Sequence, residues 1–145
     1  MTATLEAAPP RASALRVALL GNPNTGKTTL FNVLTGFRAK TGNYAGVTVE
    51  RRAGRLRCAD KDARPVDLVD LPGAYSLAAQ SPDERVAVDV LLGLKADEQP
   101  IHALLVVLDA TNLRRNMLLA SQGVELGLPT IFALNMSDEA SKQGI

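Results

Sequence analysis

The segment that most constrains the fold is an octapeptide near the N-terminus, which joins an apolar run to an expected helix. Its residues are Gly21-Asn22-Pro23-Asn24-Thr25-Gly26-Lys27-Thr28, which match the spacing G-x-x-x-x-G-K-[ST]. The apolar run before it, Arg16 to Leu20, is typical of a buried strand, and Thr29 to Gly36 after it is typical of a helix. The N–H groups of such a turn, the helix N-terminus and the lysine ammonium all attract phosphate. The pattern therefore predicts a site for nucleotide phosphates.

The composition is that of one soluble globular domain. Apolar residues make up 46% and charged residues 21% of the 145 residues, and the net charge of +1 argues against a nucleic-acid partner. The single cysteine, Cys58, excludes an intramolecular disulfide and a multi-cysteine metal cluster. No run approaches the roughly 18 apolar residues of a membrane span, and residues 1–15 lack the apolar core of a secretory signal. We therefore expect a flexible tail over 1–15, one domain over 16–145 and a cytoplasmic location.

Strand and helix patterns alternate along the rest of the chain. Between the first helix and the next strand, Phe37 to Val47 carries two glycines and few periodic apolar positions, as a mobile loop does. The expected strands are an outer strand around Gly54 within Thr48 to Cys58, and the runs Pro65 to Asp70, Ile101 to Leu108 and Pro129 to Leu134. The expected helices run from Pro82 to Leu94 and from Leu113 to Leu126. This alternation predicts a three-layer α/β fold with a mainly parallel sheet.

Local signals mark the ends of the later helices. Ser81-Pro82-Asp83-Glu84 is a capping box with proline at the first helical position. Asn112 is the expected cap of the next helix, and Gly127 is expected to end it.

Four arginines cluster around the expected outer strand. They are either a basic patch for a partner or solvated charges that protect a sheet edge, and the second interpretation is favoured. These residues are Arg51, Arg52, Arg55 and Arg57.

Oxygen-bearing side chains follow the expected strands, where ligands bind in parallel α/β sheets. Thr28 and Asp70 are expected to hold Mg²⁺, Asp70 through water. Thr48 either ligates Mg²⁺ when a γ-phosphate holds its loop closed, or simply begins a strand. The segment Asp70-Leu71-Pro72-Gly73 either turns the Gly73 N–H toward the γ-phosphate or is only a good turn. Lys27, Thr48 and Gly73 are thus the candidates for contact with the reacting phosphate.

A fourth segment, Asn135-Met136-Ser137-Asp138, follows the last expected strand and suggests the base. A carboxylate fixed at Asp138 can accept both N–H groups of the guanine Watson–Crick edge, which adenine does not supply. Leaving a buried polar group unpaired is a strong way to reject the wrong base. The alternative is that Ser137 or Asp138 caps a final helix, a role that is compatible with base recognition. The four segments together predict binding of GTP and GDP.

The chain resembles the N-terminal G domain of the bacterial ferrous iron transport protein B family from Arg16 to Asp138. The stretch GNYAGVTVER and the NMSD form of the guanine motif are much more specific to that family than the generic GTPase motifs. The resemblance implies a Ras-like P-loop GTPase fold. It also implies a cytoplasmic regulatory domain of a membrane Fe²⁺ transporter, whose membrane portion follows in the same polypeptide.

The resemblance adds three expectations. Asn24 matches an asparagine that helps to hold K⁺ beside the phosphates, although it also suits a turn after Pro23. Ala74 stands where many Ras-like proteins carry a water-positioning glutamine, so intrinsic hydrolysis should be slow. The sequence ends before the family's fifth guanine-contacting segment, last strand and closing helix, which leaves Pro129 to Leu134 as an expected uncovered edge, prone to association.

Three functions remain open. The first is a Mg²⁺-dependent, K⁺-stimulated slow GTPase. The second is a regulatory module that binds GTP or GDP and scarcely hydrolyses it. The third, a ribosome- or RNA-associated GTPase, is disfavoured by the near-neutral net charge.

Overall fold

A single six-stranded sheet organises the molecule, for which a computed structural model describes residues 13–58 and 60–145. The strands lie in the order β2-β3-β4-β1-β5-β6. They are β1 (Leu15–Gly21), β2 (Lys40–Asn43), β3 (Glu50–Arg55), β4 (Val66–Asp70), β5 (Ala103–Asp109) and β6 (Thr130–Asn135). The helices are α1 (Lys27–Thr35), α2 (Pro82–Leu91), α3 (Leu113–Glu125) and α4 (Ser137–Lys142), with a 3₁₀ turn over Ala110–Asn112. Of the tail expected over residues 1–15, residues 1–12 lie outside the described part, and Leu15 already begins β1.

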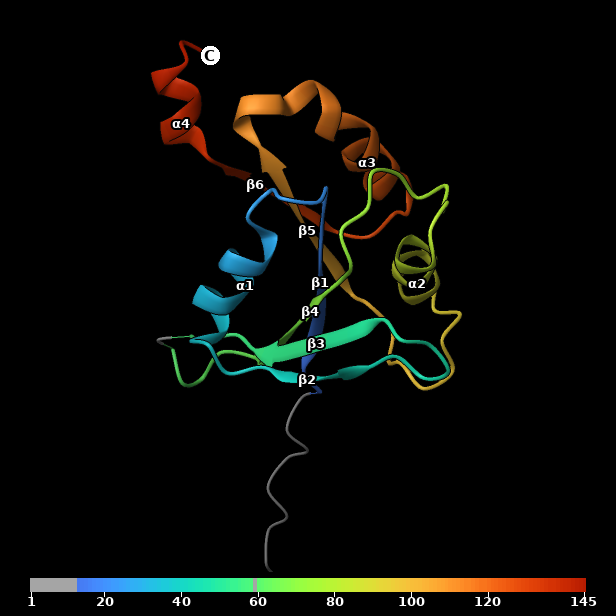
Figure 1. Ribbon diagram of the computed structural model, residues 1–145. Helices are drawn as coiled ribbons and strands as arrows, with labels where there is room; N and C mark the ends of the chain where they lie inside the picture. The colour runs from blue at the N-terminus through green and yellow to red at the C-terminus, as the bar shows by residue number, and fades with distance from the viewer. Residues whose placement is uncertain (1–12, 59) are drawn as a thin grey trace, which may run out of the picture.

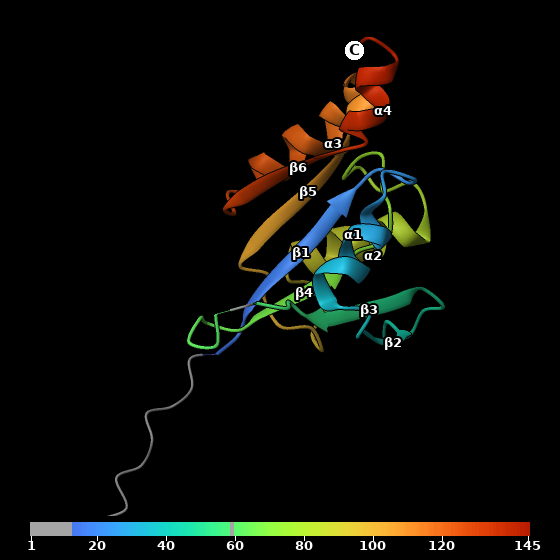
Figure 2. The ribbon, with the colours of Figure 1, turned by 90° about the vertical axis from the view of Figure 1, so that its left-hand side faces the viewer.

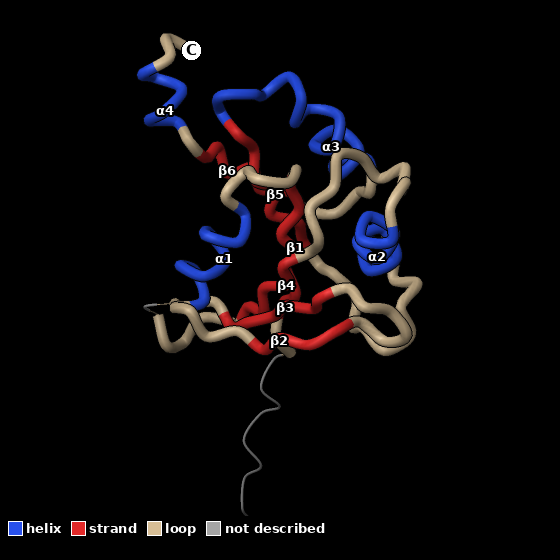
Figure 3. The backbone as a smooth tube through the Cα atoms, viewed as in Figure 1, coloured by secondary structure: helices blue, strands red, loops and turns tan. Residues whose placement is uncertain are grey.

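The sheet is mainly parallel, as the sequence predicts. Strands β4, β1, β5 and β6 run parallel, whereas β3 is antiparallel to β4 and β2 is antiparallel to β3. The carboxyl ends of the four parallel strands therefore meet at one edge of the sheet. Figures 1 and 3 show the three layers, with α1 on one face and α2 and α3 on the other. Figure 2 shows the twist of the sheet between β2 and β6.

Each face has its own aliphatic core. On one face Phe31 of α1 packs with Leu19 and Leu68 from the central strands. On the other face a larger cluster includes Val90 of α2, Leu119 of α3 and residues of β1, β4 and β5. The central strands are covered on both faces, which is why their sequences are nearly continuous apolar runs. None of the helices within residues 13–58 and 60–145 is long and apolar enough to cross a bilayer.

The expectation of a loop through Phe37 to Val47 is wrong in part, because Lys40–Asn43 forms the edge strand β2. All four residues of β2 are exposed, so the strand rests on backbone pairing and carries no apolar alternation that a sequence could display. Since β2 occupies the edge, β3 is an inner strand. Its arginines therefore do not guard an edge, and Arg51, Arg52 and Arg55 are each paired with a carboxylate.

The side chains of strand β6 are more exposed than its apolar sequence predicts. The apolar run Pro129 to Leu134 suggests a strand that is covered on both faces. In the structure Ile131 and Leu134 are more than half exposed, and among the described strands β6 pairs only with β5. The expectation of a buried strand is therefore wrong, whereas the expectation of an uncovered edge over Pro129 to Leu134 is confirmed.

The helix ends follow the sequence signals in two cases out of three. The Ser81 hydroxyl accepts the Glu84 N–H at 3.2 Å, as a capping box requires, and Gly127 takes a left-handed φ of 74° after α3. Asn112 makes no side-chain cap to α3. The turn before α3 is held instead by the Asp109 carboxylate, which accepts the Thr111 N–H at 2.8 Å.

A buried carboxylate ties the connection between α2 and β5 to the sheet. Glu98, whose side chain is 4% exposed, accepts hydrogen bonds from Arg16 of β1 at 2.7 Å and from Arg51 of β3. Burial alone would raise the pKa of Glu98, but the hydrogen bonds from Arg51 and Arg16 outweigh it and hold the pKa below its usual value. Glu98 is therefore ionised at neutral pH and links three separate segments.

Replacing this carboxylate by its amide should destabilise the fold. For Glu98→Gln we expect a loss of about 3 kcal/mol in the free energy of unfolding at pH 7, because the buried Arg16 guanidinium and the partly exposed Arg51 guanidinium lose their counter-charge. A pKa lowered in the folded state stabilises above the ordinary value of 4.5 and loses that effect as pH falls through the folded value. The difference between wild type and variant, measured by urea denaturation, should therefore shrink below that pH.

Glu139→Gln is the matched control, because Glu139 is half exposed and pairs only with Lys142 in the same helix. Its effect should stay under about 0.5 kcal/mol. Equal stabilities of Glu98→Gln and wild type at pH 7 would contradict the proposed role of Glu98 as a clamp between β1, β3 and the connection from α2 to β5.

Candidate functional site

The turn between β1 and α1 has the backbone shape that a phosphate loop needs. Gly26 takes a left-handed φ of 82° at the N-cap of α1, a conformation that favours glycine. A Cβ added there would overlap the Asn135 side-chain amide. The Thr25 hydroxyl closes the turn by donating to the Asn22 carbonyl at 3.0 Å. The helix begins at Lys27, two residues before the predicted start, so its first N–H groups belong to the motif itself.

Lys27 joins the turn to the end of β4. Its ammonium group is buried, forms an ion pair with Asp70 and donates to the Leu71 carbonyl at 2.5 Å. The neighbouring Thr28 hydroxyl donates to the other Asp70 oxygen at 3.4 Å. Asp70 therefore contacts both Lys27, the predicted phosphate ligand, and Thr28, the other predicted Mg²⁺ ligand.

Two hollows that share a wall form a continuous cleft over these residues. One, of about 320 Å³, is lined by Thr48, Pro72 and most of the residues just described. The other, of about 470 Å³, is lined by Asn22, Pro23, Asn24, Gly26 and Thr29. Both hollows include Lys27, Thr28, Gly73 and Asp83. The structure thus brings Thr48 to the cleft beside Thr28 and Asp70.

The loop that carries Thr48 is fixed on both sides by buried side chains. Tyr44 is 2% exposed and packs in the larger core, and Val49 packs there as well. The Tyr44 N–H donates to the Val49 carbonyl at 2.9 Å, which closes the loop. Burial raises the pKa of the Tyr44 hydroxyl to about 12, so it stays protonated at neutral pH. Thr48 itself is exposed.

The segment after β4 lies directly against the phosphate loop. A Cβ added to Gly73 would come within 3.1 Å of the Pro23 backbone, so a larger residue would push the two segments apart by a few tenths of an ångström. The Ala74 N–H donates to the Gly21 carbonyl at 3.2 Å, and the Ala74 side chain is fully buried in the core. A larger side chain at Ala74 would have to displace core residues before it could reach the cleft.

The fourth motif reaches the site through its asparagine. The Asn135 side-chain amide donates to the Thr25 carbonyl at 2.8 Å across the top of the sheet. Met136 takes a left-handed φ of 58° and occupies the N-cap position of α4, without a side-chain cap. The alternative in which Ser137 or Asp138 caps α4 is therefore wrong. Both are exposed residues in its first turn, and neither lines the two hollows.

Sequence reasoning missed several cleft residues and one contact that supports the phosphate loop. Asp83 lines both hollows, although the sequence marks it only as part of a helix cap, and Val49, Glu50 and Arg52 line one of them. The buried Asn22 amide donates to the Arg115 carbonyl at the start of α3, at 3.3 Å. Asn22 occupies the second position of the phosphate-loop motif. Because the motif allows any residue there, the sequence could not have predicted this contact.

The donor set at Thr28 and Asp70 fits Mg²⁺. A hydroxyl and a carboxylate lie side by side, and oxygen is the ligand that this cation prefers. Within the described residues no group of three or more His, Cys, Asp or Glu side chains converges on one point. The protein therefore offers few ligands here, as expected where substrate phosphates supply the others. Asn24 is exposed at the cleft with a left-handed φ of 65°, which suits a turn and leaves its side chain available to a cation.

Comparison with known proteins identifies the family of the chain. The model of the family "Ferrous iron transport protein B" matches residues 15–145. The Fe(2+) transporter FeoB of Escherichia coli K12 is 51% identical over 135 residues, which cover 90% of this chain and 16% of that protein. The transporter of Salmonella typhimurium is 50% identical over the same shares. The chain thus spans about one sixth of the length of these relatives.

Solved structures of the family have the same fold. A crystal structure of a mutant NFeoB from S. thermophilus bound to GDP matches with a TM-score of 0.79 and 46% identity, covering 90% of this chain and 48% of that one. The G domain of the FeoB iron transporter from T. maritima matches with a TM-score of 0.78 and 38% identity, covering 90% and 77%. The chain therefore belongs to the ferrous iron transport protein B family and has the fold of its N-terminal G domain.

Proposed function

We propose that the chain binds GTP and GDP together with Mg²⁺ and hydrolyses GTP slowly, with stimulation by K⁺. The observation that carries this proposal is the meeting of Lys27, Thr28 and Asp70 at one cleft beneath a glycine turn. A family member with this fold has been crystallised with GDP, which supports the choice of nucleotide.

Each residue of the cleft has a role that its position allows. The N–H groups of the loop from Gly21 to Thr29 would hold the β-phosphate, and the Lys27 ammonium would exchange part of its contact with Asp70 for the β- and γ-phosphates. Thr28 and Asp70 would hold Mg²⁺, which would neutralise phosphate charge. Thr48 and Gly73 line the same hollow as Lys27 and Thr28, and their Oγ1 and N–H groups would face the γ-phosphate there.

The guanine base would bind beside α4. Asn135 fixes the loop through Thr25, and the exposed Asp138 carboxylate is free to accept the two N–H groups of guanine. The backbone of Met136 and Ser137 carries Asp138 across the end of the sheet. The absence of a helix-cap hydrogen bond from Asp138 leaves both of its oxygens available to the base.

A specific observation also favours the second candidate, a module that binds GTP or GDP and hardly turns over. Ala74 is buried in the core and has no group that could orient water. Hydrolysis then depends on backbone groups and on a cation at Asn24, which would supply positive charge to the transition state as an arginine finger does elsewhere.

The role of the domain in the family is part of the proposal. The relatives are named Fe(2+) transporters, and this chain covers only a small share of them. We infer a regulatory domain on the cytoplasmic face of the membrane, joined to a membrane portion that carries Fe²⁺. The near-neutral net charge of +1 disfavours a ribosomal role.

Base recognition can be tested at one atom. Asp138→Asn replaces an acceptor by a donor, so GTP should bind at least about tenfold more weakly, and xanthine nucleotides should bind better than they do to wild type. Competition against a fluorescent GDP analogue measures both. Glu139→Gln, in the same exposed helical turn, is the control and should leave both affinities unchanged. Unchanged GTP affinity in Asp138→Asn would refute the assignment.

The K⁺ proposal predicts a difference between salts. Phosphate release from GTP should be faster in KCl than in NaCl for wild type, because K⁺ is held beside the phosphates, and equal in both salts for Asn24→Ala. GDP affinity should change little in this variant, since the side chain serves hydrolysis. If wild type shows no preference for KCl, the proposal that K⁺ stimulates hydrolysis is refuted.

The phosphate loop predicts a matched pair of glycine variants. Gly26→Ala should cost about 2 kcal/mol of folding stability, from a strained left-handed backbone and a lost Asn135 bond, and should abolish GDP binding. Gly127→Ala has a similar φ of 74° with open space around the added Cβ, so it should cost only about 1 kcal/mol and spare binding. Denaturation and GDP titration measure both; equal GDP affinity in the two variants would contradict the loop assignment.

A further inference from the structure

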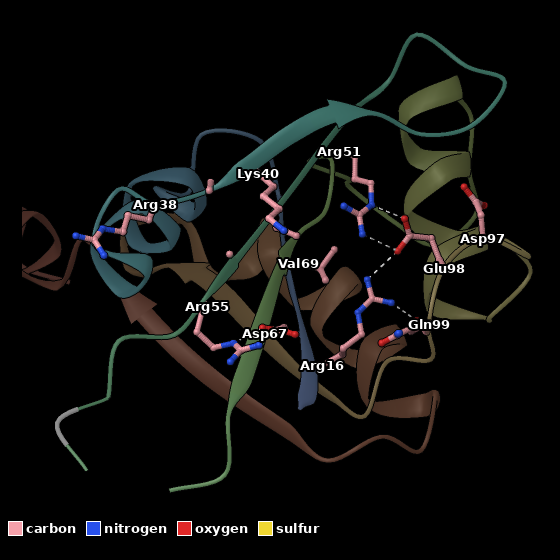
Figure 4. Close-up of a pocket in the computed structure, with 13 residues that line it drawn as sticks. Arg16, Arg38, Lys40, Arg51, Arg55, Asp67, Val69, Asp97, Glu98 and Gln99 are labelled. Carbon is pink, nitrogen blue, oxygen red and sulfur yellow. Dashed lines mark hydrogen bonds and ion pairs between the residues drawn. The ribbon is translucent and has the colours of Figure 1, made fainter. Parts of the chain in front are cut away.

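A second pocket lies on the α2 face of the sheet, away from the cleft. It has a volume of about 700 Å³ and shares no lining residue with the two hollows of the cleft. Its walls come from the amino-terminal half of β1, from β2, β3 and β4, and from the connection between α2 and β5 (Figure 4). The floor contains the small or aliphatic side chains Ala53 and Val69. A volume of this size is in the range of sites for small organic molecules.

The charges around this pocket do not balance. Five cationic side chains line it against three carboxylates, an excess of two positive charges. The cations are Arg16, Arg38, Lys40, Arg51 and Arg55, and the carboxylates are Asp67, Asp97 and Glu98. In Figure 4 the Lys40 side chain reaches toward the middle of the group, whereas Arg38 points away from it. An excess of positive charge around one hollow attracts an anion.

Several hydrogen-bond donors at the pocket have no acceptor among the described residues. Arg51 uses Nε and Nη2 on Glu98, which leaves its Nη1. Arg55 uses only Nε on Asp67, which leaves both of its Nη groups. Lys40 forms no ion pair within residues 13–58 and 60–145. The Arg55 side chain is 60% exposed and that of Arg51 is 34% exposed, so a ligand from solvent can reach these donors.

The back of the pocket is rigid by comparison. The Arg16 and Glu98 side chains are 6% and 4% exposed, and Arg16 also donates to the Gln99 carbonyl. This buried pair fixes Arg51 from behind while its outer edge stays open. The arrangement has the layout of a preformed small-molecule site, with an apolar floor and a few fixed polar groups.

We propose that this pocket binds a small organic phosphate, in which a phosphomonoester dianion is held by Lys40, Arg51 and Arg55. Guanidinium groups match the geometry of phosphate oxygens and can contact them in pairs. With Arg38 pointing away, the other four cations still exceed the three carboxylates by one positive charge, which favours an anion in this pocket. The organic part of the ligand rests on the partly buried Ala53 and fills a volume that inorganic phosphate alone would leave to water.

The test uses NMR on the whole chain in the presence of GDP and Mg²⁺. Phenyl phosphate is the probe, inorganic phosphate is the second arm, and NaCl at the same ionic strength is the blank. Phenyl phosphate should shift the Nε–H signals of Arg51 and Arg55 in a saturable manner and bind more tightly than inorganic phosphate. The amide signals of Gly26 and Lys27 should not follow the same titration.

Lys40→Ala supplies the decisive variant, since Lys40 is exposed and its loss should not disturb folding. It should weaken phenyl phosphate about tenfold, which corresponds to about 1.4 kcal/mol. Arg114→Ala is the control, because Arg114 is an exposed arginine of α3 and does not line the pocket. The proposal is overturned if Lys40→Ala binds as wild type does, if NaCl reproduces the shifts, if inorganic phosphate binds equally well, or if the shifts follow the phosphate loop.

Discussion

The buried ion pair between Lys27 and Asp70 is the interaction on which the site depends. It joins the loop after β1 to the end of β4, two strands that are neighbours in parallel register with Leu19 opposite Asp70. Both side chains are less than a tenth exposed, so neither charge is stable there without the other. The pair therefore holds together the two segments that must face a nucleotide. A lysine that is already pre-oriented against one anion needs only a small movement to engage another.

The strand β3 connects the cleft with the second pocket. Successive side chains of a strand point to opposite faces, and β3 uses this alternation fully. Glu50 and Arg52 line the cleft, whereas Arg51, Ala53 and Arg55 line the pocket on the α2 face. The Arg51–Glu98 contact then ties the same strand to the connection between α2 and β5. The strand β3 thus contributes residues to the cleft, to the second pocket and to the contact between Arg51 and Glu98.

The sequence predicts those parts of the structure whose signals are local. Lys27 and Asp70 come together because the motif spacing and the rule on strand ends both hold, and Ser81 caps α2 because its partner lies three residues away. The clamp at Glu98 is invisible to such reasoning, since its partners lie 47 and 82 residues distant. Strand β2 carries no apolar pattern because it is wholly exposed. The apolar run of β6 alone suggests burial, because such a run does not say what covers it, whereas the resemblance to the family correctly indicates an uncovered edge.

The buried anchors of the Thr48 loop set a mechanical limit on how far that residue can travel. Thr48 is bonded directly to Val49, and consecutive Cα atoms are always about 3.8 Å apart. While Val49 and Tyr44 remain in the core, Thr48 can pivot about its neighbour but cannot translate across the cleft. A larger excursion requires the Val49 side chain to leave the core, at a cost of about 2 kcal/mol of apolar burial. The distance that Thr48 can travel is therefore set by its neighbour Val49, and Tyr44 anchors the other end of the same loop.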